Sequence, residues 1–112
     1  MLAQHSMYAR EKLADAISIL ATHPGTIRER LRAAVIEFGL VPRASIPNFH
    51  GVDKDVEWIY KQVTDREESY PGEGKFHASI NRMRNARACL IAERIVTAHA
   101  KLGMYISTQK HG

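Results

Sequence analysis

The chain has 112 residues, of which 45% are hydrophobic and 25% are charged, and its net charge is +4. These proportions are those of one ordinary globular domain and exclude a disordered chain. The single cysteine, Cys89, excludes an internal disulfide and fits a reducing compartment. The apolar runs of the chain are too short to cross a membrane, and "MLAQHSMYAREK" lacks the apolar segment of a signal peptide. We therefore expect a cytoplasmic protein.

Two amphipathic helices joined by a short turn are predicted first. Apolar residues recur three or four positions apart over residues 9–20 and 27–38, and Gly39 is placed to end the second helix. The turn "HPGT" ends in an N-cap residue, Thr26, with Glu29 at the spacing of a capping box. The alternative is an anion site at this helix start, but the pattern of a phosphate-binding P-loop is absent. We therefore predict a joint between helices.

The second half of the chain is predicted to form two more helices. Residues 40–51, "LVPRASIPNFHG", contain two prolines and no sustained period, which predicts an ordered loop pinned to the core by Ile46 and Phe49. A helix over residues 52–66 then turns Val56, Ile59, Tyr60 and Val63 inward, with Trp58 at the edge of that stripe.

A polar turn, "REESYPGEGK", precedes one long basic helix predicted over residues 76–102. Residues 1–6 and 104–112 are expected to be frayed tails. The whole chain, residues 1–112, is thus predicted to be all-α, a compact single-domain bundle of about four helices with a long basic C-terminal helix.

Two stretches of the chain resemble a known group of proteins. "ISILATHPGTIRERL" and "RMRNARACLIAERI" are similar to segments of short uncharacterised bacterial proteins found in genomes and mobile elements. The pattern of that group runs ILATGPGDxRERL and later Lys/Arg-Asn before IAxRI. Here His23 replaces the first glycine and Thr26 replaces the aspartate, another good N-cap residue. The resemblance covers about half of the chain, supports the helical joint and implies no activity.

Charge is distributed unevenly along the chain. Residues 46–74 carry a net charge of −4 and residues 75–112 a net charge of +6, so the basic C-terminal third indicates an acidic partner. On the long predicted helix Arg87, Arg94 and Lys101 lie seven residues apart and form one stripe beside the apolar face.

Arginine and asparagine are residue types that contact phosphates and base edges, so this helix is the predicted binding surface. Arg84 is expected nearer the core, paired with a carboxylate of the third helix. The alternative is a solvated flank that neutralises the acidic middle segment, and the helix lacks the interleaved aromatic residues that single-strand binders use. The predicted binding residues are Lys75, Arg82, Arg84, Arg87, Arg94 and Lys101, with Arg28 and Arg32 on the second helix.

No metal, cofactor or catalytic site is predicted. The six histidines lack His-x3-His spacing, and the acidic residues after His50 lack the ligand order of an EF-hand. Asp53 or Asp55 is better placed as a favourable charge at a helix start. Cys89 lies mid-helix among apolar neighbours, which predicts a small packing residue rather than a nucleophile.

The predicted function is that of a non-enzymatic helical binding module from a bacterial or phage cytoplasm, with an acidic partner, nucleic acid being the first choice. The alternative is a protein-interaction regulator, such as a phage- or mobile-element-encoded inhibitor or adaptor that meets an acidic protein surface. A helix-turn-helix is also possible, with Arg28, Glu29 and Arg32 on the recognition helix, although Glu29 near phosphates disfavours it.

Overall fold

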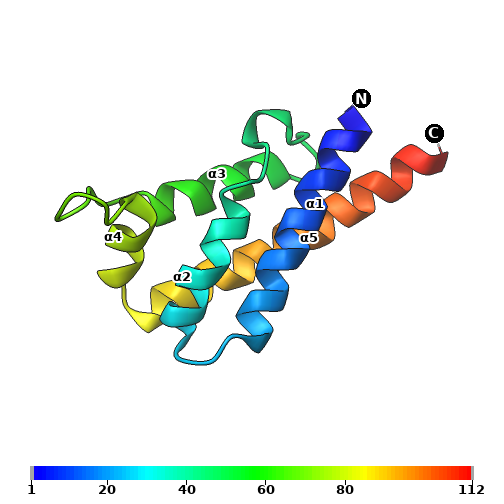
Figure 1. Ribbon diagram of the computed structural model, residues 1–112. Helices are drawn as coiled ribbons and strands as arrows, with labels where there is room; N and C mark the ends of the chain where they lie inside the picture. Colours follow the sequence, from blue (N-terminus) through cyan, green and yellow to red (C-terminus); the bar gives the residue numbers. More distant parts are fainter. Residues whose placement is uncertain (1, 112) are drawn as a thin grey trace.

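The computed structural model describes residues 2–111, with side chains described for residues 4–109, and within this range it contains helices and no strand (Figure 1). The all-α prediction is therefore confirmed, with five α-helices in place of about four. The elements in chain order are α1 (Leu2–Thr22), α2 (Ile27–Phe38), the 3-10 turn η1 (Arg43–Ser45), α3 (Val52–Val63), α4 (Lys75–Asn81) and α5 (Asn85–His111).

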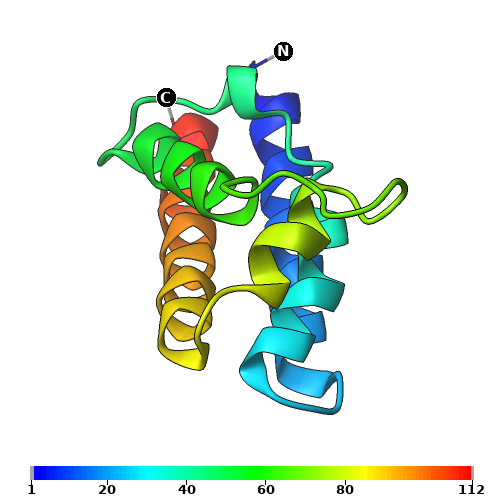
Figure 2. The same ribbon diagram turned by 90° about the vertical axis from the view of Figure 1, so that its left-hand side faces the viewer.

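The longest helix, α5, runs the length of the molecule, which measures 48 × 26 × 19 Å. It packs against α1 on one flank and α3 on the other, and α2 packs against both α1 and α5. Figures 1 and 2 show that the start of α1 and the end of α5 lie at the same end of the molecule, whereas α4 and the start of α5 lie toward the opposite end.

The turn between α1 and α2 is closed by the predicted capping box. The Thr26 hydroxyl accepts from the Glu29 N–H at 3.2 Å, and Glu29 Oε1 accepts from the Thr26 N–H at 3.1 Å. These hydrogen bonds lower the pKa of Glu29 below its usual range. Arg30 donates to the carbonyl of Leu20 at 2.8 Å, and so satisfies an acceptor near the end of α1. The predicted joint is confirmed.

The end of α2 is set by close packing of the backbone. Gly39 is the C-cap, as predicted, but its φ of −61° lies in the right-handed region that any residue adopts. A Cβ at Gly39 would lie 3.0 Å from Cε2 of Phe76, the second residue of α4. This position favours glycine because the ring of Phe76 packs closely against its backbone, and not because the backbone is left-handed.

The loop after α2 and helix α3 agree with the predictions. Ile46 is buried, and the ring of Phe49 meets that of Tyr105 on α5 at 5.5 Å between centroids. The inward residues Val56, Ile59 and Val63 are buried, while Tyr60 and Trp58 are half-buried beside them. The helix ends at Val63, three residues before the predicted boundary at residue 66.

The prediction of one helix over residues 76–102 is wrong, because α4 ends at Asn81 and α5 begins at Asn85. In a continuous helix, the positions between buried Ile80 and buried Ile91 that share their face are Arg84 and Arg87. Burying two guanidinium groups without partners costs far more than breaking one helix. Residues 82–84 therefore leave the helical path, and both arginines are exposed.

Residues 2–6 belong to α1 and 104–111 to α5, and fraying of these helix ends stays a prediction. The two ends support each other because α1 packs along α5. Ser6 and Ile106 are accordingly buried. Residues 1 and 112 lie outside the described residues.

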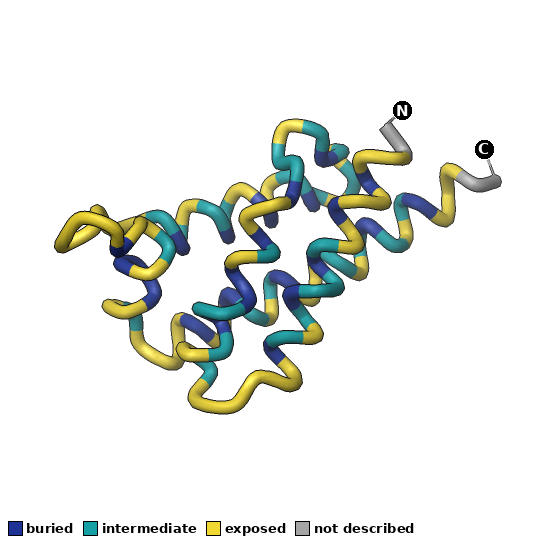
Figure 3. The backbone as a smooth tube through the Cα atoms, in the orientation of Figure 1, coloured by how far each residue is buried: buried dark blue, intermediate teal, exposed yellow. Residues whose placement is uncertain are grey.

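The core is apolar and lies where the five α-helices face one another, as the dark segments of Figure 3 show. Its largest fully buried side chains are Leu13, Leu31, Val35, Phe38, Val52, Val56, Ile59, Val63, Ile80, Ile91, Ile95 and Leu102.

Candidate functional site

The predicted stripe of Arg87, Arg94 and Lys101 exists, and it faces α3. Lys101 donates to Asp55 Oδ2 at 2.7 Å, and Arg94 lies 3.4 Å from Asp55 Oδ1. The Arg94 guanidinium also lies 4.4 Å from the ring centroid of Trp58. One carboxylate of the acidic middle segment thus pairs with two of the three cations and offsets one of their two charges, which agrees in part with the alternative that this helix is a neutralising flank.

Arg87 differs from the other two cations because its partner is neutral. Its Nη1 donates to Gln62 Oε1 at 2.8 Å, and Gln62 carries no charge to offset the guanidinium. The side chain is therefore held in one orientation while its positive charge remains available.

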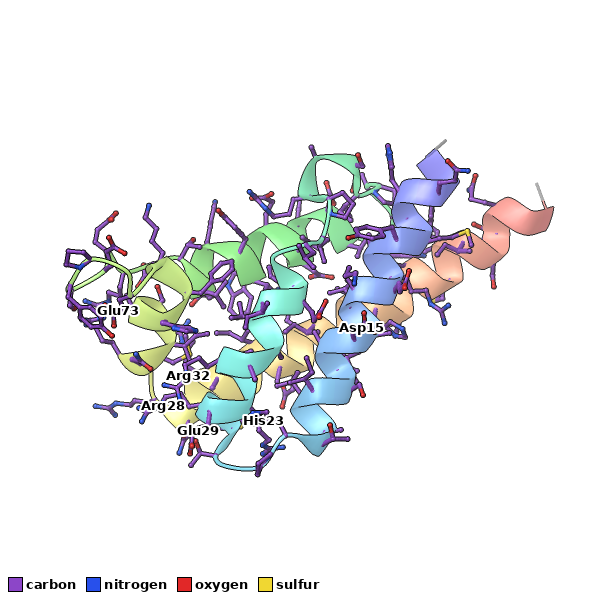
Figure 4. The ribbon with its side chains drawn as sticks, viewed as in Figure 1. Asp15, His23, Arg28, Glu29, Arg32 and Glu73 are labelled. Atoms are coloured by element: carbon purple, nitrogen blue, oxygen red, sulfur yellow. The ribbon has the colours of Figure 1, made fainter. Side chains whose placement is uncertain are left out.

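The two predicted arginines of α2 bind the segment that joins α4 to α5. Arg28 donates to the carbonyl of Met83 at 3.2 Å, and Arg32 donates to Asn81 Oδ1 at 2.8 Å. Figure 4 shows both side chains on the side of α2 that faces α4, with Glu29 beside them. Each guanidinium thus uses some of its N–H donors to fix the segment between α4 and α5.

Lys75 and Arg82 lie next to carboxylates of the acidic loop, residues 64–74. Lys75 pairs with Glu67 at 3.5 Å, and Arg82 lies 3.8 Å from Glu73 while donating to the carbonyl of Ala78 at 2.7 Å. Glu73 is buried and accepts from the Ser69 N–H at 2.7 Å, which lowers the pKa of its carboxyl with help from Arg82.

A groove of about 480 Å³ lies between the end of α3, α4 and the first turns of α5. We call it the arginine groove. Four arginines and one aspartate line it, together with neutral and apolar side chains. The lining residues are Gln62, Asp65, Arg66, Ser79, Arg82, Met83, Arg84, Ala86, Arg87 and Leu90.

The charges of the arginine groove are only partly offset. Arg66 pairs with Asp65 at 3.6 Å, and Arg82 has its contact with Glu73. Among the described residues, no carboxylate lies within 4.0 Å of the guanidinium groups of Arg84 and Arg87. The predicted pairing of Arg84 with a carboxylate of the third helix is therefore wrong, since the side chain is exposed at the break.

The start of α5 adds partial positive charge beside these arginines. The Ala88 N–H donates to the Arg84 carbonyl at 3.1 Å, which puts Arg84 at the N-cap position. Its side chain has only donors and cannot cap the helix. In the described part of the chain, no side-chain acceptor is bonded to the N–H groups of residues 85–87. These N–H groups, together with the exposed guanidinium groups of Arg84 and Arg87, make the start of α5 electropositive.

Sequence reasoning found three groove residues, Arg82, Arg84 and Arg87, and missed the wall supplied by α3 and the start of the acidic loop. Arg66 lies in the acidic loop, three residues after the end of α3, and its N–H donates to the buried hydroxyl of Ser79 at 2.8 Å. That contact joins the acidic loop to α4 and depends on the tertiary fold, so no local pattern signals it.

Cys89 is exposed, so the prediction of a small packing residue is wrong. Its neighbour Ala88 takes the buried position, and the next residue on that face is Ile91. A second cleft, of about 430 Å³, lies beside Trp58. Its lining has mixed charge, with three basic and two acidic residues: Arg43, Ala44, Ile46, Asp53, Lys54, Glu57, Trp58 and Lys61.

The fold and the groove define a small all-α protein with an open, arginine-lined recess at one end. Comparisons with protein families, with curated proteins and with solved structures found no match to the chain. The resemblance to short bacterial proteins therefore stays a prediction. Among the described side chains, residues 4–109, no group of three or more His, Cys, Asp and Glu is arranged to hold a metal ion. None of the described helices is long and apolar enough to cross a membrane.

Proposed function

We propose that this protein is a non-enzymatic helical module that binds nucleic acid in a bacterial or phage cytoplasm, holding phosphates at the arginine groove. The observation that carries this proposal is the pair Arg84 and Arg87, which are exposed in the groove and, among the described residues, have no carboxylate within 4.0 Å of their guanidinium groups. Arg66 and Arg82 lie in the same recess and add to the positive potential.

Guanidinium groups suit this role because they donate two parallel hydrogen bonds to a phosphate. The hydrogen bond to Gln62 orients Arg87 before any ligand arrives, which reduces the entropy lost on binding. Arg94 and Lys101 contribute less, because Asp55 already accepts from both. The proposed contact region is therefore smaller than the stripe that the sequence predicts.

A protein-interaction module is the second candidate. Its support is the solvent-facing side of α5, where Leu90, Val96 and Met104 are 52%, 50% and 55% exposed. Together with the arginine groove, such apolar side chains fit an acidic protein surface with an apolar centre. A regulator of this kind, for example an inhibitor or adaptor, would show weak nucleic-acid binding at moderate salt.

The test is a double variant, Arg84→Gln with Arg87→Gln, measured by fluorescence anisotropy with labelled DNA and RNA over a range of salt concentrations. We expect the affinity to fall at least tenfold at low salt. The slope of log K against log salt should flatten by roughly one to two units, because each lost phosphate contact removes about 0.7–0.9 unit.

The control is Lys54→Gln with Lys61→Gln, which removes the same charge from an exposed part of α3 outside the arginine groove. We expect only a small change in affinity from this variant. Equal losses for the two double variants would show that net charge alone drives binding. Absence of nucleic-acid binding by the parent protein at moderate salt would reject the proposal and favour the protein partner.

A further inference from the structure

Resting on the nucleic-acid function proposed above, we infer that the arginine groove selects single strands and takes one unstacked nucleotide into the recess. Duplex nucleic acid fits it poorly. Three observations carry this inference: the apolar side chains that line the groove, its size, and the short reach of the available positive charge.

Part of the groove lining is apolar. Met83, Ala86 and Leu90 line the groove together with the arginines, and Leu90 is 52% exposed. A duplex presents sugars and phosphates to such a recess and keeps the faces of its bases stacked inside. A single strand can turn a base outward, and that base gains contact with these apolar side chains while its phosphates meet the arginines.

The groove has the size of a small-ligand site. Its volume of about 480 Å³ falls within the range of recesses that bury most of a small molecule. A double helix admits an α-helix into its major groove and is itself far too wide to enter a recess of this size. One nucleotide of a flexible strand can enter, with its neighbours outside.

The guanidinium of Arg87 can also supply a flat stacking surface. The hydrogen bond to Gln62 holds this group at the edge of the groove. Arginine planes stack on unpaired bases in the way that aromatic rings do. This compensates for the lack of aromatic side chains among the groove residues.

The available positive charge does not extend far enough to follow a duplex backbone. Beyond Arg87 along α5, Arg94 and Lys101 are paired with Asp55. In the acidic loop, two residues after the end of α3, Asp65 brings a carboxylate to the groove itself. The phosphates of a duplex backbone would therefore extend beyond the cationic region within a few nucleotides. A single strand anchored by one or two phosphates needs only the region that the groove provides.

The experiment compares a labelled strand of about 12 nucleotides, as DNA and as RNA, with the same strand annealed to its complement. Anisotropy titrations of the parent protein at one salt concentration should show at least tenfold tighter binding to the single strand. Leu90→Ser should weaken single-strand binding about fivefold or more. The slope of log K against log salt should stay the same, because the variant loses an apolar contact and keeps every charge.

Val96→Ser is the matched control, since Val96 lies on the same helix, is 50% exposed and does not line the groove. It should leave both affinities unchanged. Equal affinity for single strand and duplex, or an equal effect of the two serine variants, would overturn the inference and leave the proposed function standing. Absence of binding to every probe would instead overturn the proposed function, and the inference with it.

Discussion

Thr26 and Arg84 occupy the same position in two helices and have opposite effects there. Thr26 accepts from the first turn of α2, and Glu29 completes the capping box, so the start of α2 is satisfied within the protein. Arg84 has no acceptor to offer, so the start of α5 remains open beside two uncompensated guanidinium groups. The side chain at the N-cap position thus decides whether the first N–H groups of the helix have an acceptor within the protein.

Replacing Thr26 by alanine tests the closed start. We expect Thr26→Ala to lower the free energy of unfolding by about 0.5–2 kcal/mol, because the Glu29 N–H loses its acceptor. Urea denaturation followed by circular dichroism measures this change. Thr97→Ala, at an exposed position within α5, is the control and should change stability by less than about 0.5 kcal/mol.

Nucleic-acid affinity should be the same in Thr26→Ala as in the parent protein. An unchanged stability would mean that the hydrogen bonds of the capping box do not stabilise α2. A loss of binding at full stability would instead place part of the ligand at the turn between α1 and α2.

Helices α3 and α5 are joined by one buried carboxylate between two cations. Asp55 is 9% exposed and accepts from Arg94 and Lys101. The arrangement ties the middle of α5 to the start of α3 and shortens the basic surface of α5. Under the proposed function, a change at Asp55 should therefore affect both stability and nucleic-acid binding.

Asp55→Asn should have two effects. Stability should fall by about 1–3 kcal/mol, because the cations lose a charged partner at a poorly hydrated position. Nucleic-acid affinity should rise and its salt dependence should steepen, since Arg94 and Lys101 become available for phosphates. Denaturation curves and salt-dependent anisotropy measure the two effects on the same variant.

Glu57→Gln provides the comparison for Asp55→Asn. Glu57 pairs with Arg43 at an exposed position, 3.2 Å apart, and such pairs contribute little to stability. We expect near-parent stability and binding. A salt slope of Asp55→Asn equal to that of the parent would show that ligand does not reach Arg94 and Lys101 even when they are released.

The existence and type of the main helices could be predicted from periodicity, and the break between α4 and α5 shows the limit of that signal. Ile80 and Ile91 are spaced as on one continuous helical face, so the pattern alone favours one helix. The intervening positions Arg84 and Arg87 carry the contrary signal, because a continuous helix would turn them toward the core. Giving that signal its energetic weight would have predicted the break.

At the scale of the whole molecule, the structure separates charges that lie close in sequence and joins others that lie far apart. The arginines of α5 could be predicted as candidates from their density. Their different roles could not, because Gln62 and Asp55 meet them from a helix that is 25 to 46 residues away. The groove likewise depends on the placement of Arg66 beside α4, which only the packed structure supplies.

The packing of α1 against α5 makes the stability of the molecule depend on pH. His99 on α5 is half-buried near Arg10 of α1, and burial followed by the charge of Arg10 lowers its pKa below the usual 6.5. The unfolded chain therefore binds a proton more readily than the folded one. Stability is retained above about pH 6.5 and is lost as the pH falls through the interval below it.

His99→Gln should remove this contribution. Thermal denaturation of both proteins between about pH 7 and pH 5 should show a smaller loss of Tm on acidification for the variant than for the parent. His77→Gln, at an exposed position on α4, should retain the parent's pH dependence. Identical pH dependence in the parent and His99→Gln would contradict a neutral imidazole at this contact.

The start of α1 and the end of α5 share one end of the molecule, and the arginine groove lies at the other end of α5 (Figures 1 and 2). A helix of 27 residues is about 40 Å long. A group attached near the start of α1 or near the end of α5 therefore stands roughly that far from the groove. A fluorophore, an affinity handle or a sensor surface can therefore be coupled at either end without obstructing the recess. By the same geometry, a fusion partner placed there leaves the groove accessible, so the protein can be attached to a larger assembly with the groove exposed to solvent.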